Sequence, residues 1–108
     1  MIYELRKYDL NKTNKKYFYK RFEEKLLPIF NKYEFKIVGA WDVLDEDKSE
    51  TIYILEWDNI EIMQNTWKVF HQDKEWKDIK EISLKEHGVL VDSTHSTIMK
   101  PTSYSSIK

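Results

Sequence analysis

The chain has 108 residues, no cysteine and a formal net charge of −1, from 18 basic and 19 acidic residues. This length fits one domain with a single core. The nearly balanced charge gives no argument for nucleic acid or an anionic membrane as a partner. The lack of cysteine excludes disulfides, thiol nucleophiles and cysteine-bound zinc. Aromatic residues make up 15% of the chain, so we expect some of them to line a pocket or a subunit interface.

No segment has the features of a signal peptide or a membrane span. The first residues lack a positively charged start followed by an apolar run. No apolar stretch approaches the roughly 20 residues that cross a bilayer. We therefore expect a cytoplasmic protein with no membrane partner.

The first half of the chain predicts a strand followed by a long helix. Residues 2–9 alternate between apolar and polar, with Ile2, Glu4, Arg6 and Tyr8 on one face. A helix is predicted from about residue 14 to residue 33, and Pro28 inside it predicts a kink or a short restart near residues 25–27. The first half of this helix is basic, and we interpret that half as a solvated face; its basic residues are Lys12, Lys15, Lys16, Lys20 and Arg21.

The second half predicts two more strands, an interrupted helix and a last strand. Residues 35–44 and 51–58 alternate as strands, with a polar hairpin loop between them and Gly39 as the position of a bulge or a close backbone approach. Asp58 or Asn59 can cap a helix that starts near residue 60, and Asp73 can cap its second segment. Residues 89–91 and then 92–99 read as a final strand of mixed polarity.

The element order β-α-β-β-α-β predicts an α+β fold of the ferredoxin-like type, with an antiparallel sheet and the helices on one face. Residues 1–100 form the single domain, and residues 101–108 form a polar C-terminal tail. Strand 51–58 is apolar on both faces, and one helical layer covers only one of them. We therefore expect a homodimer that packs sheet against sheet as a dimeric α/β-barrel.

A polar cluster is predicted on the first strand, where Glu4, Arg6 and Tyr8 share a face. If this strand pairs with strand 51–58, Glu56 could lie opposite on the same face. Such a cluster in an apolar surround is a place where ligands bind and pKa values shift. The same residue types are also typical of a structural salt-bridge network that binds no ligand.

The three histidines, His71, His87 and His95, have no metal-ligand spacing, so no metal site is expected. If His95 points toward the helices, it could act as a general base or bind haem iron from one side. Otherwise it is an ordinary strand histidine.

The tryptophans are expected mainly in the core, and some of them could line a pocket for a planar ligand. The residues predicted to bind such a small hydrophobic or aromatic ligand are Tyr8, Trp41 and Trp67. There is no phosphate-binding glycine loop and no nucleophile elbow, and no cofactor is expected.

Several short motifs, in this order and spacing, resemble the NIPSNAP family: Tyr3-Glu-Leu-Arg-Lys-Tyr8, Leu26-Leu-Pro-Ile-Phe30, Gly39-Ala-Trp41, Trp57-Asp58 and Asp73-Lys-Glu-Trp76. The resemblance covers roughly residues 2–100. A departure is the start of the second helix, where Gln64, Asn65 and Thr66 stand near the place of an expected arginine. The resemblance implies a dimeric α/β-barrel, and in relatives of that fold a pocket lies between sheet and helices. It carries over no reaction.

Two functions follow from these predictions. In the first, the protein is a NIPSNAP-type ligand-binding or interaction module of undetermined biochemical activity. In the second, it is a cofactor-independent monooxygenase or isomerase acting on a small aromatic or polyketide-like substrate. In that enzyme, Arg6 would stabilise negative charge and His95 or Glu56 would move a proton. Haem binding through His95 is a third, minor alternative.

Overall fold

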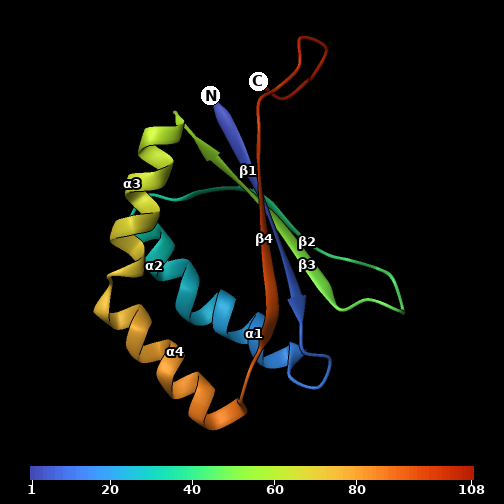
Figure 1. Cartoon of the computed structure of the whole chain (residues 1–108), viewed down its shortest axis with the longest axis vertical. Coiled ribbons are helices and arrows are strands. Elements are labelled where there is room, and N and C mark those ends of the chain that lie inside the picture. The colour runs from blue at the N-terminus through green and yellow to red at the C-terminus, as the bar shows by residue number, and fades with distance from the viewer.

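The computed structural model describes residues 1–108 and confirms the predicted order of strands and helices. Four strands form one antiparallel sheet in the order β2-β3-β1-β4. All the helices lie on one face of this sheet (Figure 1). The elements are β1 (Ile2–Leu10), α1 (Lys15–Arg21), the π-helical turn η1 (Phe22–Leu26), α2 (Leu27–Lys32), β2 (Lys36–Asp42), β3 (Glu50–Trp57), α3 (Ile60–His71), α4 (Lys74–His87) and β4 (Val91–Met99).

The interruption predicted in the first helix takes the form of a π-helical turn. Pro28 has no N–H and lies in the first turn of α2, so the normal hydrogen-bond pattern cannot continue through it. The chain adjusts one turn earlier, where the Leu27 N–H donates to the Phe22 carbonyl five residues back. The backbone therefore stays helical from α1 through α2.

The caps predicted for the second helical region are confirmed. The Asn59 side chain accepts a hydrogen bond of 2.8 Å from the backbone N–H of Ile62 at the start of α3. The Asp73 side chain accepts one of 2.8 Å from the backbone N–H of Trp76 at the start of α4. Both bonds satisfy donors that a helix start leaves unpaired, and the Asp73 bond lies at the corner between α3 and α4.

The strand register decides which side chains face the helices. Glu4 lies opposite Leu55 and Arg6 lies opposite Tyr53, so these four residues share the helix-covered face. On the same strands, Leu5 lies opposite Ile54 on the other face, which no helix covers. We call this the outer face.

The core lies between the sheet and the helices and is dominated by aromatic rings. Tyr53, Leu55, Ile29 and Phe30 are almost completely buried. Phe30 and Phe35 stack with centroids 4.2 Å apart, and Trp57, Trp67 and Phe70 pack around them. A second, smaller cluster of Leu10, Phe18 and Leu90 closes the other end of the helical layer.

The bulge predicted at Gly39 is confirmed, since the register of β2 against β3 shifts between Ile37 and Gly39. A Cβ at Gly39 would meet the far edge of the Trp41 ring at 2.7 Å, so this ring lies where any larger residue at position 39 would displace it. None of the helices combines the length and the apolar character that crossing a bilayer requires.

Candidate ligand-binding site

The polar cluster predicted on the first strand lies between the sheet and the helices. β1 places Glu4, Arg6 and Tyr8 at alternate positions toward α3. α3 brings Trp67 and His71 to the same region, because residues four apart share one side of a helix. Strand and helix periodicity together therefore gather charged and aromatic groups at one place.

Glu4 is the centre of this cluster and is only 3% exposed. Its Oε1 accepts hydrogen bonds from the indole N–H of Trp57, at 3.1 Å, and of Trp67, at 2.8 Å. Its Oε2 accepts one of 2.6 Å from Ser96 and lies 3.5 Å from Nη1 of Arg6. The carboxylate thus has a partner for each oxygen, which is what makes a buried charge tolerable.

Arg6 lies beside Glu4 and extends along the ring of Trp67, 4.5 Å from its centroid. Its Nη2 donates to the Tyr8 hydroxyl at 3.2 Å, and that hydroxyl pairs with the Tyr53 hydroxyl at 2.7 Å. Burial raises the pKa of Tyr53 well above its ordinary value, so this phenol stays neutral. The Nε of Arg6 is buried and has no hydrogen-bond partner, so the guanidinium keeps unused donor capacity.

Arg21, on α1, is a second arginine in the same region, and it is half-buried rather than part of a solvated face. Its guanidinium lies 5.3 Å from the Trp76 ring and donates to Ser83 Oγ at 3.3 Å. No acidic side chain pairs with it, and burial lowers its pKa. The interpretation of Arg21 as a solvated surface charge is therefore wrong.

Arg6 and Arg21 both border a cavity of about 150 Å³ between the sheet and the helices. Most of the lining is aromatic or aliphatic and largely buried. His71 also borders the cavity, and burial, with Lys80 and Arg6 nearby, lowers its pKa so that it is neutral near pH 7. The other lining residues are Tyr8, Phe18, Phe22, Leu26, Phe30, Trp67, Phe70, Trp76, Val91 and Thr94.

The structure brings together three of the residues singled out from the sequence, namely Arg6, Tyr8 and Trp67. The placement predicted for Glu56 is wrong. It lies opposite Tyr3 on the outer face and accepts a hydrogen bond of 3.3 Å from the Tyr3 hydroxyl. Residues directly opposite each other share a face of the sheet. Along β3, Tyr53 and Leu55 lie on the helix-covered face with Arg6, and Glu56, the next residue, lies on the outer face.

His95 and Trp41 also lie on the outer face. His95, in β4, lies opposite Lys7 of β1, and its Nε2 lies 3.1 Å from a carboxylate oxygen of Asp9. It does not point toward the helices. Trp41 is opposite Ile52, and half of its surface is exposed. Neither residue reaches the cavity.

Sequence reasoning missed three polar lining residues, Arg21, His71 and Thr94. His71 follows Trp67 by four residues, and Thr94 lies opposite Tyr8 in β4. Helical spacing and strand pairing would have found these two once the register was known. For Arg21 the signal was weaker, because four lysines on the same segment suggested a uniformly solvated surface.

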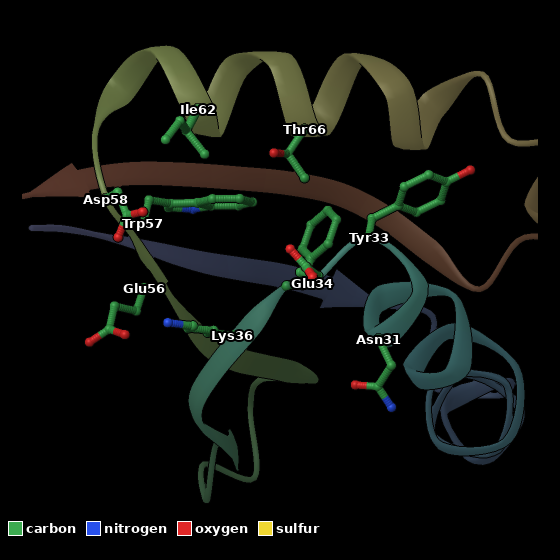
Figure 2. A pocket seen from close by; sticks show the side chains of 10 residues that line it. Asn31, Tyr33, Glu34, Lys36, Glu56, Trp57, Asp58, Ile62 and Thr66 are labelled. Atoms are coloured by element: carbon green, nitrogen blue, oxygen red, sulfur yellow. The ribbon is translucent and has the colours of Figure 1, made fainter.

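A larger hollow, of about 500 Å³, lies at the end of the sheet beside α3 (Figure 2). Only Phe35 and Trp57 among its lining residues are buried, and the rest are exposed or half-buried side chains of mixed charge. Figure 2 shows Glu56 and Trp57 pointing to opposite sides of β3. No hydrogen bond or ion pair joins the polar side chains of this hollow to one another. No group of three or more acidic or histidine side chains is placed to hold a metal ion anywhere in the chain. The cavity at Arg6 is therefore the better candidate site.

Comparison with known proteins gives matches over nearly the whole chain. The NIPSNAP family model matches residues 3–106. A NIPSNAP family protein of unknown function from Agrobacterium tumefaciens has a TM-score of 0.84 at 19% identity, covering 100% of this chain and 94% of its own. An uncharacterised NIPSNAP domain protein from Burkholderia xenovorans has a TM-score of 0.82 at 15% identity, covering 97% and 98%.

More distant structures share the fold alone. An antibiotic biosynthesis monooxygenase has a TM-score of 0.61 at 8% identity, covering 94% of this chain and 99% of its own. No curated protein sequence matches this chain.

Proposed function

The chain belongs to the NIPSNAP family, and on that premise we propose that it is a small homodimeric protein that binds a ligand between its sheet and its helices. The observation that carries this proposal is the cavity bordered by Arg6, Tyr8 and Trp67. A largely apolar cavity with a few convergent polar groups is the usual form of a binding site for a small molecule.

The size of the cavity limits the ligand. About 150 Å³ is the volume of a cavity that takes up benzene, and it is below the roughly 300–1,000 Å³ usual for drug-sized ligands. The ligand is therefore a small molecule with one ring or a short aliphatic body. A haem is far larger than this cavity, so we do not propose haem binding.

The homodimer is supported by the outer face of the sheet. Leu5, Ile52 and Ile54 lie there side by side, with half-exposed Trp41 on the neighbouring strand. No helix covers them (Figure 1). A second copy of the chain, packed sheet against sheet, would bury this apolar surface symmetrically.

We propose binding without catalysis. The monooxygenase or isomerase alternative relied on Glu56 or His95 to move a proton near Arg6, and both lie on the outer face. Glu4, the carboxylate that contacts the lining residues Arg6 and Trp67, does not border the cavity itself and is held by two indoles, a hydroxyl and Arg6. A cytoplasmic location stays a prediction from the sequence.

A titration with toluene tests the proposed binding. Toluene is a neutral probe of suitable size, and the indole N–H of Trp67, observed by NMR in the ¹⁵N-labelled protein, reports on the cavity. We expect this signal to shift in a saturable way. Thr94→Phe places a ring at the β4 side of the cavity and should abolish the shift, whereas Thr94→Val keeps the size of the residue and should retain it. An unsaturable shift, or one equal in all three proteins, would overturn the proposal.

A further inference from the structure

The cavity has an unbalanced positive lining. Two arginines, Arg6 and Arg21, border it, and none of its lining residues is acidic. The nearest carboxylate that contacts either arginine is Glu4, which is paired with Arg6. Arg21 has no ionic partner, although it is half-buried against the rings of Phe18 and Trp76.

An unpaired guanidinium at an apolar cavity is costly for the protein alone. Burial disfavours the charge, and a protein usually places an arginine there together with a carboxylate. The only direct hydrogen bond of the Arg21 guanidinium is to the neutral Ser83 hydroxyl. The group therefore retains donors for an acceptor that the chain itself does not supply.

Arg6 also has a hydrogen-bond donor without a partner. Its two polar contacts are with Glu4 and Tyr8, and its Nε has no hydrogen-bond partner. An anion in the cavity would place negative charge within the field of both arginines. A planar carboxylate suits the fork of a guanidinium better than a spherical ion does.

From this lining we infer that the ligand is a small carboxylic acid with an apolar body, bound as the carboxylate with Arg21 as its recognition residue and Arg6 as additional positive charge. The inference rests on the proposed function and deepens it. The apolar body would lie against the ring-rich wall formed by residues such as Phe22, Phe70 and Trp76. Inorganic anions have no apolar body, so they would contact the arginines and leave the aromatic wall unused.

Benzoate and benzamide form the matched pair of probes, because they have the same size and differ in charge. We expect benzoate to bind the wild-type protein at least about tenfold more tightly than benzamide, since hydrogen bonds to charged groups are the stronger ones. The shift of the Trp67 indole signal gives both dissociation constants. This comparison needs no variant, so it stands even if a substitution disturbs folding.

Variants at neighbouring positions locate the effect. Arg21→Gln keeps a donor for Ser83 and removes the charge, and it should remove most of the preference for benzoate, leaving only the part that Arg6 supplies. Arg21→Lys should retain most of the preference. Lys20→Gln removes the same charge from the adjacent, exposed residue and should leave both affinities unchanged.

Each contrary result has a distinct meaning. Equal affinities for benzoate and benzamide would overturn the carboxylate inference and leave ligand binding intact. A preference for benzoate that is undiminished in Arg21→Gln, or that falls equally with Lys20→Gln, would overturn the role of Arg21. If toluene binds and neither benzoate nor benzamide does, the carboxylate inference fails, and if toluene also fails, the proposed function fails with it.

Discussion

At the scale of single residues, Glu4 organises the interior polar groups. It holds the indoles of Trp57 and Trp67 from two different elements and is the counter-charge of Arg6. Removing one partner of a buried ion pair leaves the other charge uncompensated, and this usually costs more than the pair itself contributes. Glu4 therefore links the stability of the fold to the shape of the cavity.

We expect Glu4→Gln to lower the free energy of unfolding by about 2–4 kcal/mol, because Arg6 then lies buried without a counter-charge. Urea denaturation followed by tryptophan fluorescence measures the change. Glu46→Gln, in an exposed loop, is the control and should stay within about 0.5 kcal/mol of the wild type. Equal stabilities of the two variants would contradict the central role of Glu4.

How much of the site the sequence predicted depends on strand pairing. Glu4, Arg6 and Tyr8 could be placed together because alternation along one strand is visible in the sequence. Glu56 was misplaced because its partner across the ladder depends on the register between β1 and β3, and a shift of one residue moves a side chain to the other face. Arg21 was missed because helix packing, not local charge pattern, decides which cation of a basic segment is covered.

At the scale of elements, Asp73 ties together the corner of the helical layer. It caps α4 through the Trp76 backbone N–H, accepts a hydrogen bond from the Tyr33 hydroxyl and forms an ion pair with Lys32 at 3.0 Å. The Tyr33 hydrogen bond first, then the Trp76 N–H and Lys32, lower the pKa of Asp73 to about 2. The carboxylate thus connects the end of α2 to the start of α4.

The sign of the resulting pH dependence follows from the lowered pKa. The charged form of Asp73 is stabilised in the folded state, so its contribution is complete above the ordinary pKa of 3.8 and is lost as the pH falls toward about 2. Asp73→Asn preserves the cap, since asparagine is as good an N-cap, and removes the charge.

We expect Asp73→Asn to be less stable than the wild type by about 1–2 kcal/mol at pH 6 after allowance for solvent screening. The difference should shrink between pH 4 and pH 2, as measured by urea denaturation at each pH. A difference that is constant over this range would show that the charge of Asp73 is not the cause.

The elements themselves were largely predictable. Alternation marked the first three strands, the last strand was predicted from a segment of mixed polarity, and Asn59 and Asp73 marked the helix starts. The form of the interruption before Pro28 was not predictable, because proline excludes a regular helix but does not choose between a kink and a π-helical turn.

At the scale of the whole molecule, the fold divides the sheet into a face with a cavity and a face without a cover. The outer face carries an apolar centre, Leu5, Ile52 and Ile54, with charged groups around it, Lys7, Glu50 and Glu56. An apolar centre with a polar rim is what the proposed sheet-to-sheet homodimer would need on this face.

We expect light scattering to give about twice the 13.2 kDa mass of one chain. Ile54→Lys places a charge at the centre of the outer face and should shift the protein to the monomer, because burying an unpaired ammonium in the interface is costly. Ile82→Lys makes the same change at an exposed position of α4 and should leave the mass of the dimer unchanged. A monomeric wild type would remove the case for sheet-to-sheet pairing.

The most direct test of the account is a crystal structure of the protein grown with benzoate. We predict one benzoate in each subunit, in the cavity between sheet and helices, with its carboxylate against Arg21 and its ring against the aromatic wall. A cavity that stays empty at saturating benzoate, or benzoate bound only at the surface, would contradict the proposal that this cavity is the ligand site.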